Sequence, residues 1–119
     1  MDDIQDKVIS IAEEQGWTVT IDEQNDSNVT FYFSKFTPEG QDFSFIAETF
    51  DNDPDGLLEN IFDYYQDYDP DYEAYLWIGE DGHGRNGAPY HIADIVEDMK
   101  AAEDMVYQLH TALSNAFNA

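Results

Sequence analysis

The residues best suited to chemistry in this sequence are carboxylates that recur at a helical spacing. Residues 36–84 contain no lysine or arginine. Within that segment, four acids stand four residues apart: Asp55, Glu59, Asp63 and Asp67. Residues at this spacing share one face of a helix, with a step of about 6 Å along the axis. The spacing therefore predicts a solvent-facing row that pairs with lysine and arginine groups of another protein; the alternative is a generic solvated acidic face.

Aromatic side chains are interleaved with these acids. The set comprises Tyr64, Tyr65, Tyr68, Tyr72, Tyr75 and Trp77. One small core has no room for all of them, and tyrosine and tryptophan are the side chains that most often anchor protein interfaces. We therefore expect Tyr64 and Tyr72 to anchor a partner, with Asp71 adding its charge to the row. The alternative is that most of these rings pack against the protein's own sheet.

Two segments resemble ion-binding loops without completing them. Residues 51–56 repeat the alternating aspartates and the glycine of a calcium-binding EF-hand loop, but Phe62 stands where that loop needs a bidentate glutamate. Residues 79–87 contain four glycines, yet the adjacent acids Glu80 and Asp81 would repel a phosphate. We expect no dedicated calcium site in the first segment and an irregular loop in the second.

The sequence offers no recognisable catalytic group. Cysteine is absent, and the three histidines lack the spacing of a zinc site. No serine stands in a nucleophile elbow, and paired carboxylates carry no information in a chain with 27 acids. We therefore expect no enzyme activity, no cofactor and no metal.

The net charge restricts the class of partner. Four basic and 27 acidic residues give 4 − 27 = −23 over 119 residues. Nucleic acids and anionic membranes are themselves polyanions that bind through lysine and arginine, so neither is expected as a direct partner. The expected partner is instead a basic nucleic-acid-binding protein. The absence of cysteine and of a secretory signal favours the cytoplasm.

Apolar spacing indicates the elements that must position these groups. A hydrophobic content of 42% predicts a chain that folds despite its charge, as a single domain over residues 1–119. A helical spacing predicts a helix over about residues 2–15, ended by Gly16. Three runs of alternating apolar residues follow, around 17–21, 29–33 and 43–47. They predict an antiparallel meander of three strands.

Further helices are indicated by their start signals. An Asp-Pro pair, typical of a helix N-cap and first turn, occurs at 53–54 and again at 69–70. The first pair predicts an acidic middle helix over about residues 54–68. The second favours a helix over a strand for residues 72–78. The expected fold is α+β, with the sheet packed by the N-terminal helix, the acidic middle helix and a long C-terminal helix.

The long C-terminal helix has the clearest periodicity in the chain. Apolar residues alternate spacings of three and four from Ile92 to Ala116. A helix of that length measures on the order of 36 Å, which exceeds the width of a small sheet. Two arrangements are open: the helix crosses the sheet diagonally as part of the core, or its far end forms a homodimer.

Three stretches between Tyr72 and Leu109 carry a resemblance to known proteins. They are LWIG at 76–79, GHGRNGAPY at 82–90 and DIVED at 94–98. These stretches resemble small acidic accessory proteins carried on bacterial conjugative elements and phages. Such cargo includes antirestriction and anti-CRISPR proteins that mimic DNA. The resemblance implies an inhibitor of a host defence system and supplies no catalytic residues.

Charge, aromatic content and resemblance together lead to one expected function. The acidic helix and the Tyr-Asp segment after it would occupy the nucleic-acid channel of a restriction nuclease or CRISPR effector and inhibit it. Two alternatives stand beside it. One is a binding module, without inhibitory activity, for a basic protein of the same mobile element; the other is an acid-rich protein adapted to high salt.

Overall fold

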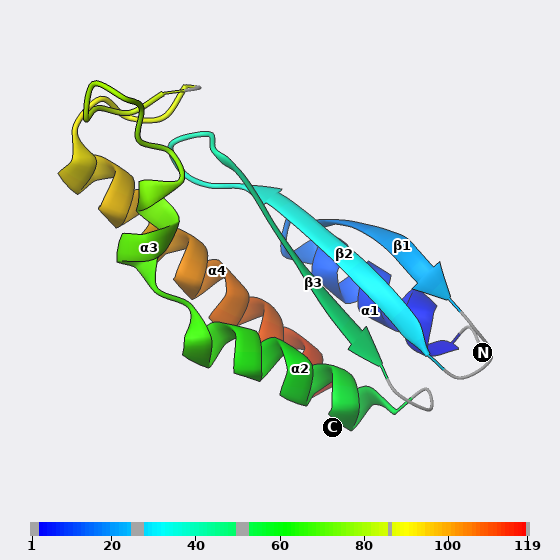
Figure 1. The fold of residues 1–119 in the computed structure, drawn as a ribbon. Coiled ribbons are helices and arrows are strands. Elements are labelled where there is room, and N and C mark those ends of the chain that lie inside the picture. The colour runs from blue at the N-terminus through cyan, green and yellow to red at the C-terminus, as the bar shows by residue number, and fades with distance from the viewer. Residues whose placement is uncertain (1–2, 25–27, 50–52, 86, 119) are drawn as a thin grey trace.

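The chain folds as an antiparallel sheet with helices packed against it (Figure 1). The computed structural model describes residues 3–24, 28–49, 53–85 and 87–118. In chain order the elements are α1 (Asp3–Glu14), β1 (Thr18–Gln24), β2 (Val29–Phe36), β3 (Asp42–Thr49), α2 (Pro54–Asp67), α3 (Pro70–Tyr75) and α4 (Ile92–Phe117). The predicted α+β class and its three-stranded meander are confirmed.

The sheet has the order β1-β2-β3, and both strand pairs are antiparallel. The β2–β3 register is continuous, whereas the β1–β2 register shifts between Ile21 and Glu23. Because side chains alternate along a strand, one face of the sheet buries Phe31 and Phe33 of β2 and Phe43 and Phe45 of β3, whereas Phe36 at the end of β2 is exposed. The opposite face leaves Tyr32 and Ile46 exposed. Helices therefore cover only one face of the sheet.

The predicted end of the first helix is confirmed. Gly16 has a φ of 93°, which a residue with a side chain rarely adopts. Its N–H donates to the carbonyl of Glu13, and the N–H of Trp17 donates to the carbonyl of Ala12, both at 3.0 Å. These two bonds satisfy the last carbonyls of α1 and turn the chain directly into β1.

Both Asp-Pro pairs begin helices as predicted. Asp53 accepts a hydrogen bond from the N–H of Asp55 at 2.9 Å, and Asp69 accepts one from the N–H of Asp71 at 3.0 Å. The proline after each cap occupies the first turn, where no N–H is needed. The helix that follows the second Asp-Pro pair, α3, ends at Tyr75. Of residues 72–78, for which a helix was predicted, only the first part is therefore helical.

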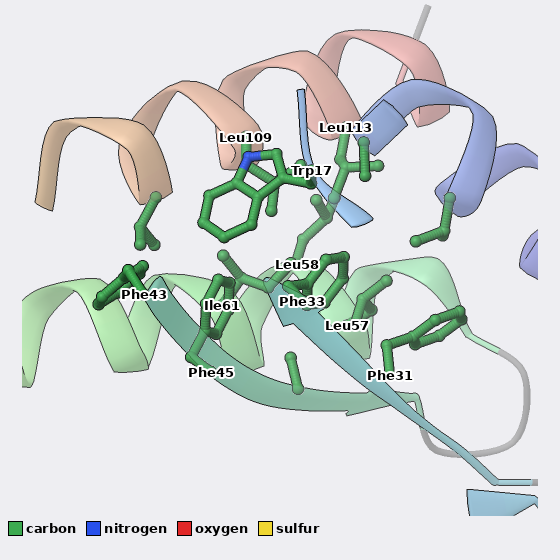
Figure 2. Packing of buried hydrophobic residues seen from close by; sticks show 14 of the residues in the cluster. Trp17, Phe31, Phe33, Phe43, Phe45, Leu57, Leu58, Ile61, Leu109 and Leu113 are labelled. Carbon is green, nitrogen blue, oxygen red and sulfur yellow. The ribbon is translucent and has the colours of Figure 1, made fainter. Parts of the chain in front are cut away.

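The main core lies between the sheet and the helices α1, α2 and α4 (Figure 2). Trp17 stands near its centre with its ring edge-on to three phenylalanines, 5.5 Å from the ring of Phe45 and 6.2 Å from those of Phe33 and Phe43. Leu57, Leu58 and Ile61 of α2, together with Val106, Leu109 and Leu113 of α4, close the core from the helical side. Burial of this apolar surface is the chief source of stability for the fold.

A second, smaller cluster lies where α3 packs against the first turns of α4. Its buried members are Ala74, Ile95 and Met99. At about 1.5 Å per residue, the 26 residues of α4 extend about 39 Å, so this helix reaches beyond the sheet and contributes to both clusters. The apolar stripe of α4 is buried within the chain from Ile95 to Leu113, whereas Ile92 at its start is 45% exposed. The homodimer stays a prediction.

A buried carboxylate joins α4 to the β2–β3 turn. Asp98 is 3% exposed and accepts hydrogen bonds from the Thr37 hydroxyl and, at 3.1 Å, from the N–H of Glu39. In the same turn, the side-chain amide of Gln41 donates to the backbone carbonyl of Gly87 at 3.0 Å. These contacts hold the turn against the start of α4 and the loop that precedes it. No helix in the described part of the chain is both long and apolar enough to span a membrane.

Candidate protein-binding surface

The acidic row of α2 lies on the solvent side of the helix. All four of its members are exposed: Asp55, Glu59, Asp63 and Asp67. The opposite side of α2 carries the buried apolar residues that pack against the sheet and α4. The predicted geometry is therefore confirmed: four carboxylates face outward with a step of about 6 Å. We call these four residues the acidic row.

None of the four basic residues is positioned to neutralise the acidic row. The ammonium of Lys7 lies 4.9 Å from the ring centroid of Phe117, and Lys35 donates to a backbone carbonyl at the end of α1. Arg85 donates to the carbonyl of Leu76. Lys100 pairs with an acid of its own helix, α4, the one ion pair among the described residues. The field of the acidic row is therefore directed to solvent without an internal counter-charge.

Asp71 does not continue the acidic row, although it stands four residues after Asp67. Helix α2 ends at Asp67, and Asp69 begins a new helix with its own cap. Asp71 is exposed in the first turn of α3. Its charge therefore belongs to a neighbouring surface, because the axis on which the fourfold spacing depends is interrupted.

The structure corrects the role predicted for Tyr64. Its ring packs against the main core and stacks on Phe45, with the centroids 4.7 Å apart and the planes at 14°. Burial, and secondarily the charge of Glu73, raises the pKa of the Tyr64 phenol. Tyr64 therefore faces the sheet from α2 and is not a free anchor for a partner.

Tyr68 is likewise part of the protein's own packing. It is nearly buried, and its hydroxyl donates to the carbonyl of Met99 at 3.0 Å. This bond ties the end of α2 to α4. The alternative interpretation, that most rings of this segment pack inward, therefore holds for Tyr64 and Tyr68.

Tyr72, the second predicted anchor, is free of such contacts. Its exposed fraction is 65%, and Tyr75 and Leu76 beside it are 73% and 51% exposed. We call Tyr72, Tyr75 and Leu76 the α3 stripe. Of these three residues, only Tyr72 was predicted from the sequence as an anchor. Tyr75 and Leu76 stand three and four residues after Tyr72, and this spacing was the signal that all three share one side of the helix.

The glycine-rich loop is closed by contacts within the chain. A short antiparallel bridge joins Ile78 to Gly84, and the ring of His83 stacks on Tyr90 with centroids 3.9 Å apart. A Cβ at Gly84 would collide with the carbonyl oxygen of Pro89. Glycine is therefore needed at this position for packing of the loop, in agreement with the interpretation of the segment as an irregular connection.

The described residues of the segment that resembles an EF-hand loop, 53–56, have structural roles in α2. Asp53 is the N-cap of α2, and Asp55 is the first member of the acidic row. Asp51 lies outside the described residues. Over the described ranges, no group of three or more histidine, aspartate or glutamate side chains is placed to hold a metal ion.

Comparison with protein-family models, with curated proteins and with solved structures found no match. Functional inference therefore rests on the residues of this chain and their geometry. The features that remain for a function are the acidic row on α2 and the α3 stripe that follows it.

Proposed function

We propose that the protein binds a basic nucleic-acid-handling protein of a bacterial defence system, a CRISPR effector or a restriction nuclease, and inhibits it by acidic mimicry of nucleic acid. The observation that carries the proposal is the acidic row: four exposed carboxylates on one rigid helix, with no counter-charge from the described residues. Asp71 and Tyr72 on α3 extend the contact beyond α2.

The spacing of the acidic row suits a channel built for a phosphate backbone. Its step of about 6 Å is of the same order as the spacing of successive phosphates along a strand. Carboxylates accept charge-assisted hydrogen bonds from lysine and arginine, as phosphates do. Because the row is held on a packed helix, little conformational entropy is lost when it enters such a channel.

The net charge of −23 supports the same proposal through the kinetics of encounter. A strong negative field steers the protein toward positively charged surfaces and accelerates association at low salt. Once bound, the protein and the nucleic acid compete for the same basic groups. Inhibition is then stoichiometric and requires no chemistry on the part of the inhibitor.

The first experiment is a pull-down from bacterial lysate at about 0.1 M salt, with and without nuclease treatment, followed by a wash at about 0.5 M. A nucleic-acid-binding defence protein should be retained at the lower salt and released at the higher, because screening weakens exposed charge pairs. The purified target should then lose nucleic-acid binding as this protein is added. Recovery of ribosomal proteins alone would contradict the proposal.

Charge-reversed variants locate the binding surface. The row variant replaces Asp55, Glu59, Asp63 and Asp67 by lysine. The matched control replaces the exposed acids Asp6, Glu13, Glu14 and Asp22 by lysine. Both variants have a net charge of −23 + 8 = −15. The row variant should lose binding and inhibition while the control keeps most of both; equal loss in the two variants would mean that net charge alone acts.

The two alternatives give different results in the same experiments. A binding module without inhibitory activity would retain a basic partner but leave its nucleic-acid binding unchanged. A protein adapted to high salt would unfold in dilute buffer and gain stability up to molar KCl. The proposed inhibitor should remain folded in dilute buffer.

A further inference from the structure

The short helix α3 exposes its apolar side chains instead of burying them. Tyr72, Tyr75 and Leu76 stand at positions i, i+3 and i+4, so they lie on one side of the helix and its C-cap. Each is at least half exposed. The one buried residue of α3 is Ala74, which packs against α4 in the smaller cluster. The helix is therefore attached through its smallest side chain while its largest ones face solvent.

Three exposed acids lie around the α3 stripe, against one cation. Asp69 and Asp71 are exposed at the start of α3, and the exposed Asp67 ends the helix before it. None of the three has an ion-pair partner among the described residues. The cation that reaches this region, Arg85, donates to the backbone carbonyl of Leu76 at 3.2 Å. The carboxylates therefore keep their charge toward solvent, beside two exposed phenol rings.

Tyrosine rings beside carboxylates suit a guanidinium better than an ammonium group. A guanidinium is planar, so it stacks on an aromatic face and also donates two parallel hydrogen bonds to a carboxylate. An ammonium is compact and strongly hydrated, and it lacks this fork. We propose that α3 is an arginine-selective docking surface, on which Tyr72 and Tyr75 stack against guanidinium groups of an arginine-rich segment in the basic partner.

This inference rests on the proposed function, because it names the groups of the basic partner that α3 meets. Charge argues against a second copy of the chain as the occupant. Two copies would bring −23 against −23, and a symmetric contact through α3 would bring Asp69 and Asp71 of both copies into one interface. An arginine-rich segment supplies both the opposite charge and the planar groups.

The test is calorimetric titration of the full chain with deca-arginine and with deca-lysine at about 0.1 M salt. The wild type should bind deca-arginine more tightly. The variant Tyr72→Ala/Tyr75→Ala should reduce the ratio of the two affinities roughly fivefold, since each exposed ring–guanidinium contact contributes about twofold to fivefold. The matched control Tyr32→Ala/Tyr107→Ala removes two tyrosines exposed elsewhere and should leave the ratio unchanged.

A second variant separates the rings from their hydroxyls. Tyr72→Phe/Tyr75→Phe keeps both aromatic faces and should keep the ratio of the wild type, with thermal unfolding used to check the fold of every variant. An unchanged ratio in the alanine variant would overturn the role of α3 while leaving the binding by the acidic row intact. Binding of neither peptide by the wild type would overturn both this inference and the proposed function.

Discussion

The aromatic rings on the helix-facing side of the sheet are buried, whereas the tyrosines Tyr72 and Tyr75 of α3 are exposed. The main core joins the sheet to three helices and encloses Trp17 and four phenylalanines of the sheet, Phe31, Phe33, Phe43 and Phe45. The smaller cluster has Ala74, Ile95 and Met99 as its buried members. It lies where α3 packs against the first turns of α4 (Figure 1). Apolar burial therefore dominates stability at the sheet end of the molecule and contributes much less at the α3 end.

Polar contacts compensate for the small apolar area at the α3 end. Asp98 holds the β2–β3 turn, and the hydroxyl of Tyr68 holds the last turn of α2 to α4. Segments with few buried apolar contacts open locally at a lower free energy than the core. The sheet end therefore acts as a scaffold, while the α3 end presents side chains to solvent. Three predictions test this division.

Removal of a ring from the main core should have the largest effect. Phe33 is fully buried and contacts the rings of Trp17, Phe31 and Phe45. Phe33→Ala should lower the free energy of unfolding by about 3–5 kcal/mol, because it removes apolar contacts and leaves a cavity. Urea unfolding followed by tryptophan fluorescence measures this loss. A loss below about 1 kcal/mol would contradict the scaffold role of the sheet end.

Loss of the buried carboxylate should have an intermediate effect. Asp98→Ala leaves the Thr37 hydroxyl and the N–H of Glu39 without an acceptor, so it should cost about 1–3 kcal/mol. The control Glu97→Ala removes an exposed acid whose surface pair with Lys100 contributes less than about 1 kcal/mol. Hydrogen exchange should also accelerate at the Glu39 amide in Asp98→Ala alone. Equal losses in the two variants would mean that Asp98 does not secure the turn.

The smallest effect should come from Glu73, a partly buried carboxyl of α3. Burial, and secondarily the charge of Asp69, raises the pKa of Glu73 above its ordinary value of 4.5. The folded state thus favours the protonated form: this contribution to stability is complete below pH 4.5 and is lost as the pH rises through the raised pKa. Glu73→Gln should therefore raise the melting temperature near neutral pH. The gain in free energy of unfolding should be less than about 1 kcal/mol, because solvent partly screens this group.

A charge-matched variant provides the control for Glu73. Glu13→Gln removes one exposed acid from α1 and relieves the general repulsion by the same amount. The gain from Glu73→Gln should exceed that from Glu13→Gln near neutral pH and should disappear below pH 4.5. A gain equal in both variants at every pH would show that only the total charge matters.

Local sequence patterns were enough to predict the helices and strands and the outward-facing acidic row of α2. Helix starts at Asp53 and Asp69 and the helix end at Gly16 depend on hydrogen bonds between residues close in the chain, so local patterns were sufficient to predict them. The alternating strands and the fourfold spacing of the row follow from backbone periodicity in the same way.

Which aromatic rings are available to a partner, and which acids are buried, depends on the tertiary structure. Tyr64 and Tyr72 are similar in sequence context, but the ring of Phe45 covers one and nothing in the described structure covers the other. Asp98 is buried because the fold places Thr37, 61 residues away, beside it. Burial depends on what the fold brings opposite a residue, and no local pattern in the chain encodes that neighbour.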